Sequence, residues 1–565
     1  MKAAPCLLDC TLRDGGYVND WAFSQAFGRA LYSALSEAGC DYVELGFLKP
    51  GAQKGLPWTN LSAGAIHSIR ETHPQGARIS VMVDYGSLEL ADIPPASAYP
   101  ADLIRVAAPA QHAAEATEFA ARIADKGYAT SVNYMGISNY SNDGILALVD
   151  TIRAHKDAVR FFYVADSFGS LLPSRTREIF STLRFGTDAP LGLHTHNNLQ
   201  LALANSLEAM EAGVDILDGS VFGMGRGAGN LFTEVMLGYL ETLEPDRFNL
   251  LPVLQFADLY MEDLKRRHSW GYSLPQLLSG LLRCHPNYPT NLLKEKAYTA
   301  DDIHQMLKRL DEAHKPRFFA KSLDSIKQGH FASLASRAPV HVSPGLQNLC
   351  QRDNGATLLV CGGRSVVHEA HHIQEFIARR SLSLFSVNQP RTPFPVDGVF
   401  FGNRRRILEH SAALEPEQEV ILSPEIHAKA ERQFGLRSVS RVNALRLLDG
   451  TPSPFANALP TNSAIHAILG LVQCGYRTIY LCGLDGYDPG QPAYYASSDA
   501  IDSPEEVARR NAVIESELDA AEVLGRALGF SFSIITRTRF ARHAAVPQRS
   551  LPVQMSAPLD SAPAN

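Results

Sequence analysis

The first 245 residues alternate between short strand-like segments and helical patterns, and this alternation limits the fold more than any other feature. The strand starts lie roughly 24 to 37 residues apart, the spacing of a strand-loop-helix-loop unit. Patterns of helical periodicity lie between them, for example 27–39 and 201–213. Eight such units predict an α/β fold, a (β/α)8 TIM barrel, with an open doubly wound sheet as the alternative. The expected strands are 6–12, 42–48, 78–85, 103–108, 129–136, 161–167, 191–196 and 216–222.

Composition excludes several classes of protein. With 45% hydrophobic residues among 565, the chain has enough apolar surface to build folded cores. The balance of 52 basic and 59 acidic residues disfavours a nucleic-acid coat or a membrane-surface binder. Eight cysteines without a CxxC pair favour neither a zinc ribbon nor a disulfide framework. The chain has no run of 18 apolar residues, so we expect no membrane span. Charged residues near the N-terminus argue against a secretory signal peptide, and we therefore expect a cytoplasmic protein.

Polar residues recur at the ends of the predicted strands. A barrel gathers the carboxyl ends of its strands on one face, where active sites lie. One shared site therefore explains polar groups that are scattered over 180 residues of sequence. These residues are Arg13, Asp14, Glu44, Asp84, Arg105, Asn133, Asp166, Ser167, His194 and His196.

The segment His194-Thr195-His196 ends the seventh predicted strand. Residues two apart in a strand point to the same side, so both imidazoles can reach one divalent ion. Asp14 ends the first strand, which neighbours the eighth in a closed barrel. Two histidines and a carboxylate leave positions open for water and substrate, and such mixed ligation suits Mn, Mg, Co, Zn or Fe.

Four motifs carry a family resemblance. LDCTLRDGG, ADSFG, HTHNN and GMGRGAGN occur in this order within residues 5–245. They resemble the signature blocks of metal-dependent carbon–carbon lyases and synthases, the family of 4-hydroxy-2-oxovalerate aldolase, 3-hydroxy-3-methylglutaryl-CoA (HMG-CoA) lyase and 2-isopropylmalate synthase. The resemblance implies an aldolase that uses Mn²⁺ or Mg²⁺, or else Co²⁺ or Zn²⁺. It acts on a pyruvate-type 2-oxo acid and an aldehyde, and it forms a homodimer. A Claisen-type acyl-CoA synthase is the alternative chemistry.

The resemblance also implies roles for individual residues. By resemblance, Asp14, His194 and His196 would be the metal ligands. Asn230 would be a further ligand or a group that hydrogen-bonds to the ligands. Arg13 would stabilise the enolate oxygen, as a guanidinium aimed at developing negative charge does. The alternative for Arg13 is an ion pair with Asp14 or another carboxylate at a strand end.

Four further residues are expected to contact the substrate. Ser167 matches the position that holds the substrate carboxylate in the aldolases, and the alternative is a helix N-cap. Glu44, Asp84 and Asn133 are expected substrate contacts by position, with structural hydrogen bonding as the alternative.

The first loop departs from the aldolase pattern. Where the 4-hydroxy-2-oxo acid aldolases read RDG-x-His, Tyr17 stands in place of the histidine. A tyrosine with a pKa near 10 is a poor base at neutral pH, so we expect the metal and Arg13 to lower its pKa, or Tyr17 to position water or substrate. The range 216–235 contains no cysteine, so the catalytic cysteine of HMG-CoA lyase is missing.

Four further segments follow the barrel, which we place at residues 1–245. Residues 246–335 read as a helical extension, with helices expected at 252–267 and 299–314 and an N-capping pattern at Thr299. Residues 336–355 contain proline and serine and are typical of a linker. The last 20 residues, 546–565, predict a disordered tail.

Residues 356–545 predict a second, Rossmann-like α/β domain. The segment ATLLVCGGRSV is a strand that enters a Gly-Gly turn, although it lacks GxGxxG and the Walker lysine. This region faintly resembles nucleotide-sugar-dependent transferase-like domains, which implies a nucleotide site at Gly362, Gly363, Asn403 and Asp485. A tight strand-to-helix turn is the alternative. A scaffold barrel fused to an active transferase is therefore the second interpretation of the whole chain.

Overall fold

The computed structural model divides into two units. It describes residues 4–49, 57–295, 298–337, 340–424, 426, 434–444, 447, 455, 460, 462–491 and 503–545. One unit, here called the barrel unit, comprises Met1–Lys294 and Leu310–Ser322. The other, the sheet unit, comprises Glu295–Arg309 and Leu323–Asn565.

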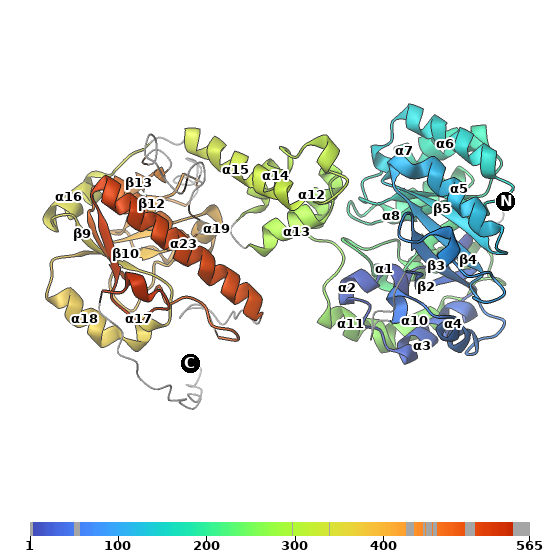
Figure 1. Ribbon diagram of the computed structural model, residues 1–565, viewed down its shortest axis with the longest axis horizontal. Coiled ribbons are helices and arrows are strands. Elements are labelled where there is room, and N and C mark those ends of the chain that lie inside the picture. The colour runs from blue at the N-terminus through green and yellow to red at the C-terminus, as the bar shows by residue number, and fades with distance from the viewer. Residues whose placement is uncertain are drawn as a thin grey trace. The chain divides into compact units, whose positions relative to one another are not determined.

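Eight parallel strands close into a barrel in sequence order, which confirms the predicted (β/α)8 fold (Figure 1). The first and last strands pair directly, with Leu8 opposite Asp218. Closure therefore brings the carboxyl ends of distant strands to one mouth. The strands are β1 (Cys6–Asp9), β2 (Tyr42–Phe47), β3 (Arg78–Asp84), β4 (Leu103–Ala108), β5 (Ala129–Met135), β6 (Phe161–Asp166), β7 (Leu191–Thr195) and β8 (Ile216–Gly219).

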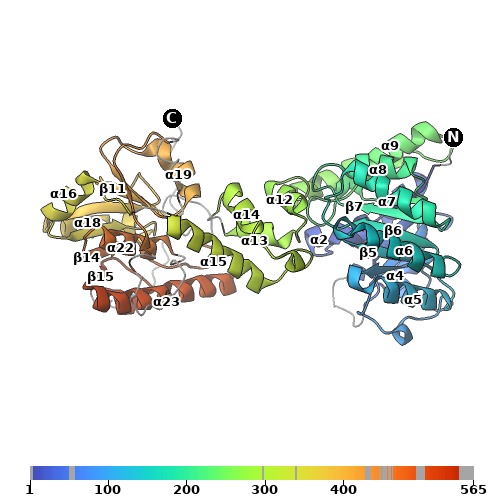
Figure 2. The same cartoon turned by 90° about the horizontal axis from the view of Figure 1, so that it is seen from above.

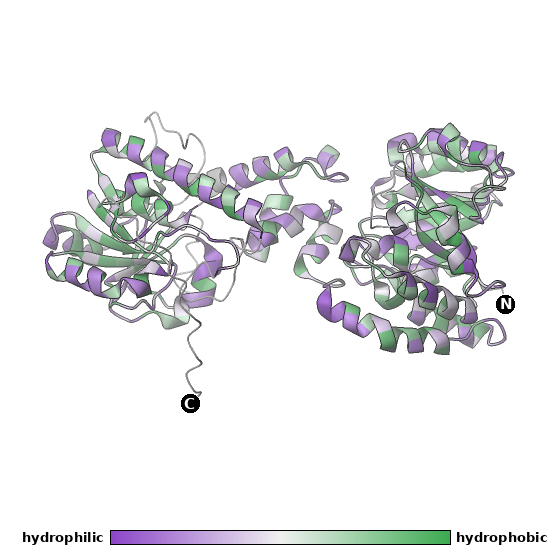
Figure 3. Cartoon of the chain, turned by 60° about the horizontal axis from the view of Figure 1, so that its bottom comes forward, coloured by the Kyte–Doolittle hydropathy of each residue, from purple (hydrophilic) through white to green (hydrophobic). Residues whose placement is uncertain are grey.

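Alternation along each strand separates the packing core from the barrel interior. In β3, Ile79, Val81 and Val83 belong to the large cluster shared with the surrounding helices. The residues between them, such as Ser80 and Met82, lie on the opposite side of the strand. Figure 3 shows the barrel strands mainly in the hydrophobic colour, with hydrophilic residues on the outer helices. The outward-facing residues thus form the large core, and the inward-facing positions hold both smaller apolar clusters and the polar groups of the site.

Helices that follow the strands cover the barrel. Ser24, Ser62 and Ser141 cap α3, α4 and α6 by accepting a backbone N–H bond, and Pro173 opens α7. The helices are α1 (Thr11–Asp14), α2 (Gly16–Asn19), α3 (Gln25–Glu37), α4 (Ala63–Arg70), α5 (Ala113–Ala124), α6 (Asn142–His155), α7 (Pro173–Gly186), α8 (Ala202–Glu211) and α9 (Thr233–Leu243).

The helical extension is divided between the two units. Its first part lies in the barrel unit: α10 (Leu251–Phe256), the π-helical segment η6 (Ala257–Met261), α11 (Glu262–Arg267), α12 (Leu274–Leu282) and α13 (Asn287–Lys294). The helix expected at 299–314 is shorter in the structure. Helix α14 spans Ala300–Leu307, and the 3-10 turn η7 (Glu312–His314) follows it. Thr299 and Asp302 form the predicted capping box at the start of α14. The side chain of Asn198, in the loop after β7, donates to the Gln276 carbonyl of α12 at 3.0 Å, so α12 packs at the barrel mouth.

The prediction of a linker at 336–355 is wrong for the second half of this range. Pro344–Arg352 form helix α16, which Ser343 caps by accepting the Leu346 N–H at 3.1 Å. The Ser-Pro pair that suggested a linker is an N-cap followed by proline at the first helical position. Residues 338 and 339 lie outside the described residues.

The sheet unit contains a seven-stranded parallel sheet in the order β13-β12-β11-β10-β9-β14-β15. Helices α16, α22 and α23 pack on one face and α17, α18 and α19 on the other, as Figure 2 lets the reader follow. The predicted second α/β domain is therefore confirmed. Its strands are β9 (Ala356–Val360), β10 (Ser383–Val387), β11 (Gly398–Phe401), β12 (Glu419–Leu422), β13 (Val439–Arg441), β14 (Thr478–Cys482) and β15 (Ser531–Ile534). Its helices are α17 (Ser365–His368), α18 (Ala370–Ala378), α19 (Arg404–His410), α22 (Ser463–Gln473) and α23 (Pro504–Leu528), and α15 (Ala320–Arg337) precedes the sheet.

None of the described helices is long and apolar enough to cross a membrane. The predicted tail, 546–565, lies outside the described residues.

Candidate metal centre

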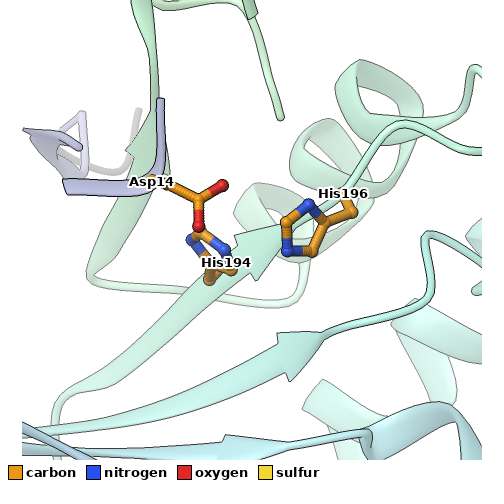
Figure 4. A group of neighbouring side chains, drawn as sticks. All are labelled: Asp14, His194 and His196. Carbon is orange, nitrogen blue, oxygen red and sulfur yellow. The ribbon is translucent and has the colours of Figure 1, made fainter. Parts of the chain in front are cut away.

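Three predicted ligands converge at the barrel mouth. Asp14 ends α1 directly after β1, His194 lies in β7 and His196 follows that strand. Their ligand atoms all lie within 4.8 Å of one another, and all three residues are buried (Figure 4). The barrel thus brings together residues that are 180 positions apart in sequence.

The second ring nitrogen of each histidine is already engaged. His194 Nδ1 lies 2.9 Å from Asp218 Oδ2, and His196 Nδ1 lies 3.3 Å from the Gly229 carbonyl oxygen. Because both partners are acceptors, each Nδ1 carries the proton and each Nε2 presents a lone pair. Metal-binding histidines are oriented in this way. The donor set therefore fits a divalent ion.

The charge states of the ligands also suit a cation. Burial alone would raise the pKa of Asp14, but the neighbouring Arg13 charge and the two imidazoles hold it well below its usual range. Burial lowers the pKa of His196 to about 3, against the attraction of Asp14. At neutral pH the site offers an ionised carboxylate and a neutral imidazole, the forms that ligate metals.

Asn230 lies beside Asp14. Its Nδ2 donates to Asp14 Oδ2 at 2.8 Å, and its Oδ1 is buried without a hydrogen-bond partner among the described residues. A buried acceptor left unpaired is costly, and a nearby cation would satisfy it. The position fits either role that the sequence suggested, a further ligand or a support for Asp14.

Arg13 makes the ion pair that was the alternative to its catalytic role. Its Nη1 contacts Asp14 Oδ1 at 2.7 Å, and its Nε contacts Glu44 Oε2 at 2.7 Å. Glu44 is fully buried, so it holds Arg13 rather than lying open to a substrate. The Arg13 Nη2 group has no partner among the described residues, which leaves one face of the guanidinium for a ligand.

A chain of buried ion pairs continues from Glu44 to the metal ligands. Glu44 Oε2 lies 3.2 Å from Arg105 Nη1, and Arg105 Nη2 lies 2.5 Å from Asp218 Oδ2. Asp218 in turn accepts the His194 Nδ1 proton. The chain therefore links Asp14 to His194 through alternating charges, and it fixes the geometry of both ligands. Such networks are strongly destabilised when one member is removed, because a buried charge then remains unpaired.

Ser167 makes a structural hydrogen bond, and its predicted contact with a substrate carboxylate stays a prediction. Its hydroxyl accepts the Gly136 N–H at 2.9 Å, which ties the loops after β5 and β6 together. It is not a helix N-cap, because α7 begins only at Pro173 after Leu172. The turn is instead held by Asp166, whose carboxylate accepts backbone N–H groups of Ser170 and Leu171.

Asp84 and Asn133 lie at inward-facing positions without a contact to the ligand cluster. Asp84 pairs with Lys49 at 3.4 Å and is about half exposed. Asn133 is buried, and its Oδ1 lies 3.4 Å from the Ser131 hydroxyl, which donates to it. Their substrate contacts remain predictions.

Tyr17 lies on α2 with its ring 4.6 Å from Trp21. Although 44% of the residue is exposed, desolvation raises the pKa of its phenol, and the charges of Arg13 and Arg226 offset this only in part. Arg13 thus lowers the pKa of Tyr17 as expected, but by less than burial raises it. The effect of a metal ion on this pKa stays a prediction.

Comparison with known proteins identifies the barrel. Over 252 residues the chain is 31% identical to the oxaloacetate decarboxylase of Mycobacterium tuberculosis. The aligned region covers 43% of this chain and 74% of that protein. The chain belongs to the HMGL-like family. That family's model matches residues 95–260. The chain is also 31% identical over 267 residues to the 4-hydroxy-2-oxovalerate aldolase of Bacillus cereus, covering 44% and 74% of the two chains. The solved HMG-CoA lyase of Bacillus subtilis is 17% identical, covers 46% of this chain and 94% of its own, and has a TM-score of 0.40.

Membership of the HMGL-like family makes this barrel a lyase- or aldolase-type enzyme of a divalent-metal-dependent group. Asp218 and Arg226 were not singled out from the sequence. Asp218 is a carboxylate within an otherwise apolar strand, and Arg226 lies inside the glycine-rich GMGRGAGN motif. Both signals were visible, but their partners come from other strands and loops and appear only after folding.

The predicted nucleotide residues of the sheet unit come together only in part. The Gly363 N–H donates to the Gly483 carbonyl at 2.8 Å, and Asp485 accepts the Ser365 N–H at 2.8 Å. Gly363 therefore allows two loops to pack closely, as the tight-turn alternative proposed. Gly362 lies in the same turn, whereas Asn403 caps α19 by accepting the Arg406 N–H at 3.1 Å. A nucleotide site here remains a prediction.

The sheet unit also holds a histidine between two carboxylates. His543 Nε2 lies 3.1 Å from Asp519 Oδ1, and its Nδ1 lies 3.6 Å from Glu522 Oε2. Because each ring nitrogen faces a different carboxylate and Arg542 also pairs with Asp519, the group has the form of an ion-pair cluster.

Proposed function

We propose that the barrel is a divalent-metal-dependent carbon–carbon lyase that works through the enolate of a 2-oxo acid, in the manner of a 4-hydroxy-2-oxo acid aldolase. The observation that supports it most is the convergence of Asp14, His194 and His196 within 4.8 Å, with Arg13 2.7 Å from Asp14. Mixed nitrogen and oxygen ligation suits several divalent ions, and among them the family resemblance favours Mn²⁺ or Mg²⁺.

The chemistry requires stabilised negative charge. Breaking a carbon–carbon bond one carbon away from a 2-oxo group leaves an electron pair that survives only as an enolate. A bound divalent ion supplies Lewis acidity toward the 2-oxo oxygen. The chain's own contribution is Arg13, whose free Nη2 would donate a hydrogen bond to the same oxygen. Glu44 and Asp14 hold that guanidinium in place before the substrate arrives.

An apolar cluster lies at the carboxyl-end halves of three neighbouring barrel strands. Phe47, Met82 and Ala107, from β2, β3 and β4, form a separate buried cluster that Trp21 covers in part. Such a surface suits the hydrocarbon part of an aldehyde, since burial of apolar area is favourable there. We therefore infer an acceptor with a short apolar chain.

Proton transfer distinguishes two candidate reactions. Aldol cleavage needs a base for the 4-hydroxyl proton, but the raised pKa of Tyr17 keeps its phenol protonated at neutral pH. Tyr17 is therefore better suited to donate a hydrogen bond. This observation favours a second candidate, decarboxylation of a 3-carboxy-2-oxo acid, in which CO2 leaves, the electron pair stays as the enolate, and no base is needed. Claisen condensation with an acyl-CoA remains a prediction.

Deuterium exchange tests enolate formation in either case. The Mn²⁺-loaded protein is incubated with pyruvate in deuterated water, and loss of the methyl proton signal is followed by NMR. We expect exchange with the unmodified protein and with Arg177→Met, a surface control, but not with His194→Ala. Absence of exchange with pyruvate and other 2-oxo acids, despite bound Mn²⁺, would contradict the proposal.

Two substrates separate the candidates. Release of aldehyde from 4-hydroxy-2-oxovalerate indicates an aldolase, and release of CO2 from oxaloacetate above the metal-only rate indicates a decarboxylase. Tyr17→Phe should slow the first reaction and leave the second unchanged, because only the first involves a hydroxyl that Tyr17 can contact.

A further inference from the structure

Three arginines surround the metal centre, and they differ in how their charge is balanced. Arg13 contacts Asp14 and Glu44, and Arg105 contacts Glu44 and Asp218. Arg226 has no carboxylate within ion-pair distance among the described residues. Two guanidinium groups are thus already neutralised by the protein, and the third retains an uncompensated charge.

The backbone of Arg226 is fixed against the ligand cluster. Its N–H donates to Asp14 Oδ2 at 3.3 Å, and its Nη2 donates to the Ser167 carbonyl at 3.4 Å. The preceding Gly225 makes this approach possible, because a Cβ there would lie 2.5 Å from Asp14 Oδ2. The half-buried guanidinium therefore extends from the metal centre toward the loop after β6.

The charge of Arg226 reaches groups on several sides of the mouth. It opposes the raised pKa of Tyr17, and after burial it contributes to lowering the pKa of His285 to about 4. These groups come from α2 and from the extension. The Arg226 cation therefore lies among groups of the barrel mouth, where it would attract a small anionic ligand.

We propose that Arg226 binds the carboxylate of the 2-oxo acid substrate. This inference rests on the proposed function, and it assigns to Arg226 the role that the sequence gave to Ser167. The Ser167 hydroxyl accepts the Gly136 N–H, and its carbonyl accepts from Arg226, so Ser167 itself offers no positive charge. A guanidinium can instead present a planar pair of N–H donors to a carboxylate. The single long bond to Ser167 leaves most of its donors available.

Oxalate, a non-reacting mimic of the pyruvate enolate, tests this role by calorimetry on the full-length Mn²⁺-loaded protein. Loss of a charged hydrogen-bond partner should weaken oxalate binding by about 10- to 100-fold in Arg226→Met. Arg226→Lys should recover part of the affinity, because it restores the charge without the planar donors. In the exchange assay, KM for pyruvate should rise in Arg226→Met while kcat changes little.

The control is Arg177→Met, which removes an exposed arginine paired with Glu208 on the outer helices and should bind oxalate like the unmodified protein. Equal oxalate affinity in Arg226→Met and the unmodified protein would overturn the inference. So would loss of Mn²⁺ binding in Arg226→Met, because the side chain would then support the metal ligands. Failure of the unmodified protein to bind oxalate would instead refute the proposed function on which the inference rests.

Discussion

At the scale of single residues, each metal ligand depends on a partner from another element. Asp218 on β8 accepts from both His194 and Arg105, and Gly229 accepts from His196. The chemistry of the ligands is therefore set by groups that do not touch the ion. Mutation of outer partners of this kind typically lowers metal affinity by about 10- to 100-fold.

Asp218→Asn tests this dependence. The substitution removes the negative charge that balances Arg105 and the acceptor that holds the His194 tautomer. We expect Mn²⁺ affinity to fall by about 10- to 100-fold, as measured by titration with EPR detection of free Mn²⁺. Asp188→Asn, at an exposed ion pair with Lys156, is the matched control. Unchanged Mn²⁺ affinity in Asp218→Asn would show that the ion-pair chain has no role in binding.

At the scale of elements, the loop between β8 and α9 shapes the site. It carries Gly225, Arg226, Gly229 and Asn230, which approach Asp14 or His196 closely enough for hydrogen bonds or near contact. Gly229 has a φ of +79°, a conformation that side chains disfavour. The glycine-rich motif thus lets a loop backbone pack directly against metal ligands.

Gly225→Ala should disturb the ligands without unfolding the barrel. The added Cβ would lie 2.5 Å from Asp14 Oδ2, and this side chain would have to move. We expect Mn²⁺ affinity to fall by about tenfold or more, with an unchanged circular dichroism spectrum. Gly64→Ala, in α4 with its nearest neighbour at 4.0 Å, should bind Mn²⁺ normally. If both variants bind alike, the loop is not packed against Asp14 as described.

A half-buried carboxyl at the start of α9 gives a pH-dependent stability. Burial raises the pKa of Glu234 to about 7, although its side chain accepts the Phe222 N–H at 3.0 Å. In the folded state it is protonated up to about pH 7, while the unfolded chain loses the proton near pH 4.5. The folded state is therefore favoured below pH 4.5, and this contribution is lost as the pH rises through 7.

Glu234→Gln should remove this pH dependence. Relative to the variant, the unmodified protein should lose about 2–3 kcal/mol of stability between pH 4.5 and pH 7. The comparison is the Tm difference between the two proteins, measured by calorimetry across this range, with the surface variant Glu178→Gln as control. A Tm difference that does not change with pH would contradict the assigned pKa.

At the scale of the whole molecule, every group of the metal centre belongs to the barrel unit. That unit also includes residues 310–322. The Arg317 carbonyl of this segment accepts a hydrogen bond at 3.0 Å from the hydroxyl of Tyr288, which lies in α13 and is fully buried. The barrel unit therefore extends past the eight-stranded barrel itself. A boundary placed only after α13 would leave a buried hydroxyl without partners.

Two fragments test this boundary. Residues 1–322 should fold and bind Mn²⁺ with the affinity of the full chain. Residues 1–294 lose the partners of Tyr288, which should lower the Tm by about 3–10 °C. Equal Tm values in differential scanning fluorimetry would show that 310–322 do not belong to the folded unit.

The barrel and the convergence of Asp14, His194 and His196 were predictable from the sequence, because strand spacing and the HxH pattern are local signals. The hydrogen bonds of Glu44 and Ser167 were not, since their partners, Arg13 and Gly136, each lie 31 residues away in sequence. The helix at Pro344–Arg352 was missed because a capping serine before proline resembles a linker. Local patterns thus predicted elements, and closure of the barrel determined which side chains meet.

The central claim is that Asp14, His194 and His196 bind one divalent ion. Pulsed EPR of the Mn²⁺-loaded protein measures it most directly, because nitrogen nuclei bound to Mn²⁺ modulate the electron spin echo. We predict coupling to two imidazole nitrogens, reduced to one in either His194→Ala or His196→Ala. Bound Mn²⁺ without imidazole coupling, or with coupling that both variants retain, would contradict the account.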